Sequence, residues 1–250
     1  MIWSLLWRWL LILVVFAGGT VLAFGGNFWM GVSLHIFLVG YLLSGTLNPS
    51  SRLFGKVRTR CGSGIWLTLD DGPDPDDTPM VLDLLDRYGA KATFFVIGQK
   101  AEKYPDLIRE IHRRGHQLGN HSWSHPRAFF WCLGPIRTYR EIVKCQRTIE
   151  RITGAAPTVF RAPVGHYNVF VHPVLKREKL ELIGWSSRGF DGVGADFESV
   201  RERIRASAND GSIVLAHEAT PIAGKVVTDI LDLAQERGWT CSIPAHGSLQ

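Results

Sequence analysis

The sequence predicts an α/β domain on a parallel sheet of seven strands, open or closed into a barrel, that follows an N-terminal membrane hairpin of two helices. Three observations predict this organisation. Residues 1–50 contain one charged side chain, Arg8. After Ser51, short apolar runs alternate with helical patterns. The residues best suited to chemistry directly follow the predicted strands, where the sites of such folds lie.

The overall composition averages two unlike parts. The chain has 250 residues, 46% of them hydrophobic, and a mean hydropathy of +0.04, which excludes a disordered or collagen-like protein. Its net charge is +5 and its pI about 9.2. The basic residues are interspersed with acidic ones on the predicted helices, so no nucleic-acid partner is expected. The four cysteines form no C-x-x-C pair; free thiols are the simple interpretation, and a Cys61–Cys241 disulfide is the alternative in an oxidising compartment.

The N-terminal region carries no Lys, Arg, Asp or Glu from residue 9 to residue 51. Two apolar stretches, 9–24 and 28–45, flank a Gly-Gly-Asn turn, and about 20 apolar residues span a membrane as a helix. We therefore expect residues 1–51 to form a transmembrane hairpin in contact with lipids. Within it, His35 is expected to hydrogen-bond the neighbouring helix. A cleaved signal peptide is the alternative, but the apolar run exceeds the usual length of about 7–15 residues and no A-x-A site closes it.

Charges at the ends of the hairpin indicate its orientation. Arg8 precedes the first stretch, and residues 52–63 form a basic juxtamembrane linker. Four basic residues stand in this linker: Arg52, Lys56, Arg58 and Arg60. Positive charge at both outer ends predicts a two-pass protein of the cell membrane whose domain after residue 51 is cytoplasmic. Because such a cluster also binds anionic lipid heads, a periplasmic or extracellular domain is the alternative.

The remaining chain alternates strand and helix signals. Apolar, β-branched and aromatic runs predict strands at 65–69, 92–97, 117–120, 158–161, 180–185, 212–216 and 240–243. Helices are expected at 78–87, 105–115, 136–153, 172–179, 199–208 and 224–237, several opened by proline or closed by glycine. The domain is placed at residues 64–245, with a tail at 246–250.

Polar residues cluster at the ends of these strands. They are Asp70 and Asp71 after the first strand, His121 and His125 after the third, Arg161 at the end of the fourth, Asp191 after the fifth and His217 after the sixth. Because parallel strands end on one edge of the sheet, these side chains are expected to meet.

Four motifs carry a family resemblance. They are T-L-D-D-G-P at 68–73, H-S-W-S-H at 121–125, R-A-P-V-G at 161–165 and L-A-H at 215–217. In this order and spacing they resemble the polysaccharide deacetylases of the NodB-homology type (carbohydrate esterase family 4), over roughly residues 64–243. One motif alone is common, whereas four in order at strand ends are specific. The resemblance implies a distorted (β/α)7 barrel.

Three of these residues suit a metal. Asp71, His121 and His125 offer one oxygen and two imidazole nitrogens, a set that leaves positions open for water and substrate, as in catalytic zinc sites. The resemblance implies that they bind one divalent ion; Zn²⁺ is expected, and Co²⁺, Ni²⁺ or Fe²⁺ accept the same ligands. The competing interpretation of Asp70-Asp71-Gly-Pro is a plain turn, which the two histidines downstream argue against.

The resemblance also implies catalytic roles. Asp70 would be the general base, held ionised and oriented by Arg161, and His217 the general acid that protonates the leaving amine, tuned by Asp191. The backbone N–H of Val164 would stabilise the oxyanion. Leu215 would line the pocket for the acyl methyl group.

Two departures from the family pattern concern the substrate. Val164 stands where the family has tyrosine, and only its backbone is needed for the oxyanion. The usual D-x-x-D-W motif reads W-S-S-R-G-F-D-G at 185–192, which keeps only the second aspartate and has Gly192 for the aromatic. The wall of the sugar groove should therefore differ. Residues 129–131 (Phe-Phe-Trp) are either core or, if exposed beside the site, suited to a lipid-linked substrate.

The sequence thus predicts a membrane-anchored, metal-dependent hydrolase of the N-acyl, expected N-acetyl, amide of an amino sugar in a glycan or lipid-linked glycan precursor. One alternative is a deformylase or deacylase of a polyprenyl-phosphate-linked sugar. Another is a catalytically idle carbohydrate-binding module, which would need neither a base nor an acid. A phosphoesterase would need a second metal cluster, for which the sequence gives no sign.

Overall fold

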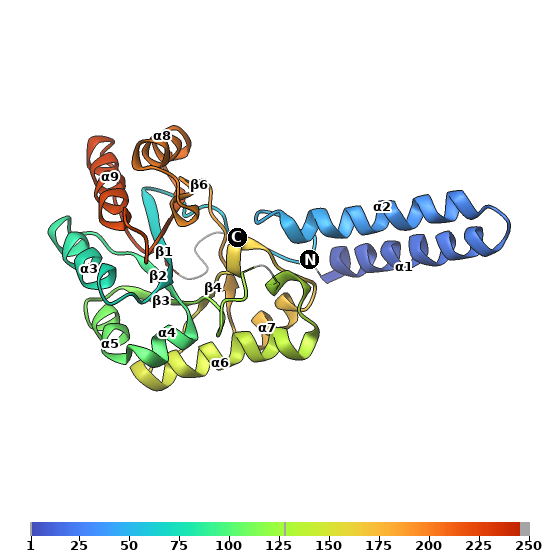
Figure 1. The fold of residues 1–250 in the computed structure, drawn as a ribbon, viewed down its shortest axis with the longest axis horizontal. Coiled ribbons are helices and arrows are strands. Elements are labelled where there is room, and N and C mark those ends of the chain that lie inside the picture. The colour runs from blue at the N-terminus through green and yellow to red at the C-terminus, as the bar shows by residue number, and fades with distance from the viewer. Residues whose placement is uncertain (1, 128, 246–250) are drawn as a thin grey trace.

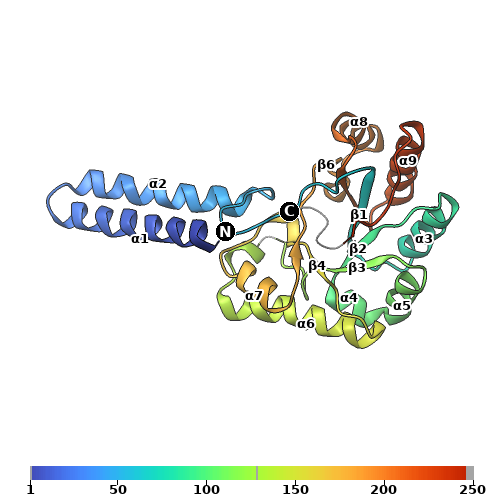
Figure 2. The ribbon, with the colours of Figure 1, turned by 180° about the vertical axis from the view of Figure 1, so that it is seen from behind.

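The computed structural model describes residues 2–127 and 129–245, in two parts. A hairpin of two long helices projects from one side of an α/β domain (Figures 1 and 2). The tail predicted at 246–250 lies outside the described residues.

The hairpin pairs α1 (Ile2–Phe24) with α2 (Phe28–Leu47) at close range. A side chain at Gly31 would meet Ala23 at 2.5 Å, so the helix backbones approach where only small residues fit. The carbonyl of Gly31 accepts a hydrogen bond from Nδ1 of His35 (2.8 Å), and Nε2 of His35 lies 3.3 Å from the hydroxyl of Thr20 on α1. This confirms the prediction that His35 bonds the neighbouring helix.

The outer surface of the hairpin is apolar. Val21, Phe24, Trp29 and Phe37 are each at least 70% exposed, a density of uncovered large apolar side chains that soluble surfaces rarely carry. Among the residues that the structure describes fully, α2 is the one helix long and apolar enough to cross a membrane.

The domain is built on one parallel seven-stranded sheet in the order β5-β4-β3-β2-β1-β7-β6. The strands are β1 (Ile65–Gly72), β2 (Thr93–Val96), β3 (Gln117–Asn120), β4 (Val159–Phe160), β5 (Glu181–Leu182), β6 (Ser187–Arg188) and β7 (Ser212–His217). The predicted (β/α)7 arrangement is confirmed, but the prediction of a final strand at 240–243 is wrong. Those residues contribute a single bridge, Cys241 to Ile65, and the seventh strand is the two-residue β6.

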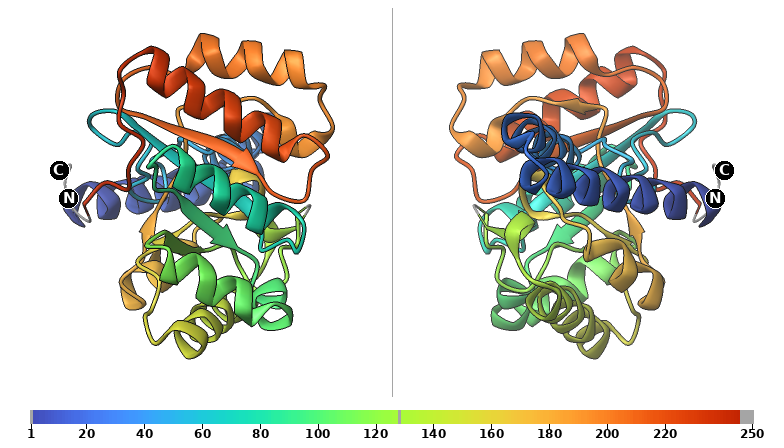
Figure 3. Two further views of the ribbon diagram at one scale, coloured as in Figure 1. Left: turned by 90° about the vertical axis from the view of Figure 1, so that its left-hand side faces the viewer. Right: turned by 90° about the vertical axis from the view of Figure 1, so that its right-hand side faces the viewer.

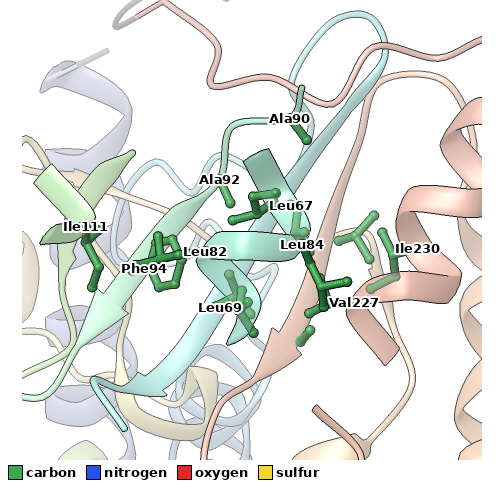
Figure 4. Packing of buried hydrophobic residues seen from close by; sticks show 14 of the residues in the cluster. Leu67, Leu69, Leu82, Leu84, Ala90, Ala92, Phe94, Ile111, Val227 and Ile230 are labelled. Atoms are coloured by element: carbon green, nitrogen blue, oxygen red, sulfur yellow. The ribbon is translucent and has the colours of Figure 1, made fainter. Parts of the chain in front are cut away.

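Helices surround the sheet (Figure 3). They are α3 (Asp77–Arg87), α4 (Gly98–Lys103), α5 (Pro105–Arg113), α6 (Pro135–Thr153), α7 (Val171–Arg177), α8 (Phe197–Ser207) and α9 (Ala223–Glu236). In the main core, Leu67 and Leu69 of β1 pack with Leu82 of α3, Phe94 of β2 and Ile230 of α9 (Figure 4), all 1% exposed or less. This core fixes the strand ends that carry the site.

The basic segment expected as a linker at 52–63 is packed into the domain. Phe54 and Val57 are buried in a second core. The N–H of Arg58 donates to the carbonyl of Leu182 in β5, and the N–H of Cys61 donates to the carbonyl of Gly211 before β7, both at 2.9 Å. The segment therefore runs from the β5 edge of the sheet to the start of β7.

The end of the hairpin is also held by the domain. Tyr167 donates its backbone N–H to the carbonyl of Thr46 (3.3 Å) and its hydroxyl to the carbonyl of Ser51. A side chain at Gly165 would meet Pro49 at 2.9 Å, so this contact requires close backbone approach. Hairpin and domain are thus joined by packing as well as by the chain. All four cysteines are free.

Candidate active site

A pocket of about 120 Å³ lies where β1 and β7 end, and it brings together seven of the nine predicted site residues. Its lining comprises Asp70, Asp71, His121, His125, Arg127, Val164, Trp185, Arg188, Phe190, Gly192, Val193, Leu215 and His217. The other two predicted residues, Arg161 and Asp191, are buried directly behind it, each bonded to a lining residue.

Three ligand atoms of Asp71, His121 and His125 lie within 4.8 Å of one another. Nε2 of His125 is 3.2 Å from Oδ1 of Asp71, and Nε2 of His121 is 3.6 Å from the same oxygen. Nδ1 of His121 donates to the carbonyl of Arg161 (2.9 Å), which leaves its Nε2 lone pair directed at the group. The backbone of Asp71 has a φ of 70° and that of His125 a φ of 49°, left-handed values that are uncommon for non-glycine residues.

The environment of these residues fits a cation. Oδ1 of Asp71 and Nε2 of His125 are buried without a hydrogen-bond partner among the described residues, a costly arrangement unless a ligand satisfies both. Burial, and after it the nearby His121, lowers the pKa of His125 to about 3. The imidazole of His125 is therefore neutral, as a metal ligand must be. Burial alone would raise the pKa of Asp71, but the neighbouring histidines and Arg127 together hold it below its usual value.

Arg127 is a site residue that sequence reasoning missed. Its guanidinium donates to Oδ2 of Asp71 (3.0 Å), the oxygen turned away from His125, while its own side chain is 65% exposed. It thereby fixes the carboxylate plane from outside. An arginine two residues beyond a histidine has no spacing rule that marks it, so no signal in the sequence could have found it.

Asp70 and Arg161 form a buried ion pair. Oδ1 of Asp70 accepts from the guanidinium of Arg161 at 2.7 Å, and both side chains are at most 5% exposed. Arg161 also donates to the hydroxyl of Thr68 (2.8 Å) and to the carbonyl of Gly184 (2.8 Å). With its guanidinium fixed in several directions, Arg161 orients Asp70, whose other oxygen lies 3.6 Å from Nε2 of His121.

His217 and Asp191 form a second pair. Asp191 is 2% exposed and accepts both the backbone N–H of His217 (2.7 Å) and its Nδ1 (2.9 Å). Burial by itself lowers the pKa of His217, but the hydrogen bond and charge of Asp191 outweigh it and the net pKa is raised. Asp191 therefore orients the His217 imidazole at the pocket and favours its protonated form.

The remaining predicted residues complete the wall. Val164 is 47% exposed with a φ of 58°, and Leu215 is 2% exposed. Gly192 packs flat against His217: a Cβ there would lie 2.8 Å from Cδ2 of the imidazole. Of the aromatic run at 129–131, Phe130 is fully buried in the second core, which agrees with the first of the two alternatives for this run. Phe129, in contrast, is 65% exposed.

Comparison with known proteins agrees with this geometry. Residues 58–183, half of the chain, match the family described as polysaccharide deacetylase. The chain is 37% identical over 171 residues to the peptidoglycan-N-acetylglucosamine deacetylase PgdA of Listeria monocytogenes, covering 68% of this chain and only 36% of that protein. It is 35% identical to the chitooligosaccharide deacetylase of Azorhizobium caulinodans, covering 65% of this chain and 77% of that one.

Solved structures show the same fold. The peptidoglycan deacetylase PdaC of Bacillus subtilis superposes with a TM-score of 0.66 at 30% identity, covering 72% of this chain and 87% of that one. A family 4 carbohydrate esterase from Streptomyces lividans, in complex with acetate, gives a TM-score of 0.67 at 27% identity, covering 73% and 93%. This chain therefore belongs to the polysaccharide deacetylase family.

Proposed function

We propose that this chain is a membrane-anchored, metal-dependent deacetylase that hydrolyses the N-acyl, expected N-acetyl, amide of an amino sugar in a glycan or lipid-linked glycan precursor. One observation carries the proposal: a candidate three-ligand metal site, a carboxylate oriented by an arginine, and a histidine oriented by a carboxylate all face one small pocket. The named activities of the relatives, which deacetylate peptidoglycan and chitooligosaccharides, support the same reaction class.

Asp71, His121 and His125 would hold the metal, with Zn²⁺ expected. When bound, such an ion polarises the amide carbonyl and makes a nearby water more acidic. Asp70 takes the proton of the attacking water on one carboxylate oxygen, because the guanidinium of Arg161 orients the carboxylate through its other oxygen. His217 delivers a proton to the departing amine, and Asp191 stabilises the imidazolium that makes this possible.

The pocket wall would orient the acyl group. The backbone N–H of Val164 donates to the developing oxyanion in this scheme. Leu215, beside β6 in the sheet, offers an apolar surface for the acyl methyl. The limited volume of the pocket favours a short acyl group such as acetyl over a long one.

Residues 1–51 would anchor the enzyme by crossing the membrane twice, with both ends of the hairpin on the cytoplasmic side. The exposed apolar surface of the hairpin supports the anchoring. The cytoplasmic orientation rests on the basic residues at both ends of the hairpin, Arg8 before it and the segment 52–60 after it. Within that segment, Arg58 pairs with Glu181 (3.6 Å) and Arg60 donates to the carbonyl of Asp210 (2.8 Å), so part of its positive charge is engaged by the domain.

Acetate release by the purified full chain in detergent micelles tests the activity. The substrates are an N-acetylated chitooligosaccharide and a lipid-linked N-acetyl sugar. Asp70→Asn should slow release about 10²–10⁴-fold, the usual contribution of a general base, whereas Asp106→Asn, a 92% exposed side chain on α5, should not. No release from either substrate by the wild type would refute the function, and full activity of Asp70→Asn would refute the base.

Reporter fusions at the C-terminus test the orientation. High β-galactosidase activity with low alkaline phosphatase activity is expected for a cytoplasmic domain. The reverse pattern would place the domain on the opposite side.

A further inference from the structure

Arg188, on the edge strand β6, lines the pocket but pairs with none of the carboxylates of the site. Each carboxylate of the site already has a cationic partner: Asp70 pairs with Arg161, Asp71 with Arg127, and Asp191 with His217. Within residues 2–127 and 129–245, Arg188 makes no ion pair and no hydrogen bond, although it is half-buried. A guanidinium removed from part of its water with no acceptor is an unfavourable arrangement unless a ligand supplies one.

Two aromatic rings hold the Arg188 guanidinium in place. Its central carbon lies 3.9 Å from the ring centroid of Phe190 and 5.2 Å from that of Trp185, and both rings also line the pocket. Stacking on aromatic faces fixes the plane of an arginine while leaving its edge N–H groups free to donate. The side chain is thus pre-oriented on the wall next to Leu215, its partner across the sheet.

In the part of the chain that the structure describes, the groups nearest to Arg188 offer its guanidinium no negative charge. His166 lies close enough for Arg188 to lower its pKa further after burial has done so, which favours a neutral imidazole. Arg203 lies near Phe190 as well, 5.6 Å from the ring centroid, with its N–H committed to the carbonyl of Gly189 (3.1 Å). A metal at the ligand set across the pocket would add further positive charge. This part of the pocket therefore suits an anion.

We propose that Arg188 forms an anion subsite that selects substrates bearing a phosphate or carboxylate next to the acylated sugar. This inference rests on the proposed deacetylase function and names its substrate class. The guanidinium edge would donate two parallel hydrogen bonds to the oxygens of the anion, the geometry in which arginine recognises phosphate and carboxylate groups. The charge would come from the phosphate that links a sugar to a lipid carrier or from a carboxylate carried by a glycan, and both present the same pair of oxygens.

Matched substrates test this selection. The full chain, purified in detergent micelles and loaded with Zn²⁺, is assayed with a neutral N-acetylglucosamine disaccharide, its 1-phosphate, and a disaccharide containing N-acetylmuramic acid. The wild type should favour at least one charged sugar by about 10- to 100-fold in kcat/KM, through KM, as expected for a charge-assisted pair. Preference for the 1-phosphate indicates a phosphate-linked source, and preference for the muramic acid sugar indicates a glycan carboxylate.

Variants assign the preference to Arg188. Arg188→Gln should bring the charged-to-neutral ratio of kcat/KM close to one, and Arg188→Lys, which keeps the charge without the planar fork, should retain part of it. Arg203→Gln is the matched control, because Arg203 lies by the same ring but does not line the pocket; its ratio should equal that of the wild type. Equal ratios in wild type and Arg188→Gln, or a wild type that does not discriminate, would overturn the proposal.

A binding measurement separates the subsite from the reaction. In an Asp70→Asn background, in which turnover should be about 10²–10⁴-fold slower, addition of Arg188→Gln should weaken binding of the sugar 1-phosphate at least ten-fold. Unchanged affinity would overturn the subsite whatever the enzyme's activity. Absence of acetate release by the wild type from every sugar, with this binding difference intact, would refute the deacetylase function and leave the subsite standing.

Discussion

Replacing Asp191 with asparagine separates the two opposing effects on the pKa of His217, those of burial and of the Asp191 carboxylate. Burial lowers the pKa of His217, while the hydrogen bond and charge of Asp191 raise it above its ordinary value. Asparagine has nearly the same shape and still offers an oxygen to the backbone N–H of His217, but it has no charge with which to stabilise an imidazolium. Once the charge is gone, burial remains, and the pKa of His217 should fall.

The size of the fall follows from the contact that is lost. Nδ1 of His217 lies 2.9 Å from a 2%-exposed carboxylate, and a hydrogen bond to a charged group contributes about 1.5–3 kcal/mol. At 1.36 kcal/mol per pKa unit, this corresponds to about one to two units. A general acid works only when protonated, so activity is lost as pH rises through its pKa. The alkaline limb of the kcat/KM profile should therefore move to lower pH by about one to two units.

The assay is acetate release across the pH range, with Asp191→Asn compared against the wild type. Asp196→Asn is the control, since Asp196 stands a few residues along the same loop but caps α8 through the N–H of Ser199. Its profile should match the wild type. An alkaline limb that stays in place in Asp191→Asn would refute the assignment of His217 as the acid.

Three further predictions concern other contacts. Arg127→Gln should weaken Zn²⁺ binding about 10- to 100-fold in competition with a chelator, because Asp71, a proposed metal ligand, loses its outer partner; unchanged affinity would contradict that role. Gly192→Ala should lower kcat about 100-fold, since the new methyl group displaces the imidazole of His217; a wild-type kcat would show that the ring tolerates it. Gly31→Leu should lower the melting temperature of the solubilised chain, whereas Gly40→Leu, with nothing within 4 Å, should not; equal effects would argue against close helix packing.

Much of the fold was predictable because its signals are local. Apolar runs and proline and glycine boundaries located six of the seven strands and the longer helices. The strand β6 was missed because Ser187 and Arg188 show no apolar pattern, and they pair with β7 only because the preceding loop brings them there. Cys241 lies in an apolar run that looks like a strand, yet the chain touches β1 at one residue.

The site was predictable where residue type and strand position coincide. Asp70, Asp71 and His217 stand on strands, so topology alone brings them together. Arg127 and Phe190 lie on loops whose path depends on tertiary packing, and no spacing connects them to the motifs. What the sequence could not supply is therefore the part of the pocket wall that these loops build around the predicted residues.

The packing of residues 54–61 into the domain has a mechanical consequence. A flexible linker would let the domain move relative to its anchor over a range set by the length of the linker. Here Tyr167 hydrogen-bonds the segment that follows α2, and Phe54 is buried in the second core. The connection between the hairpin and the domain is therefore short and packed. For an enzyme anchored through this hairpin, the mouth of the pocket stands at one fixed height above the bilayer. Such an enzyme would act on sugars presented at that height above the bilayer and not on those that lie farther away.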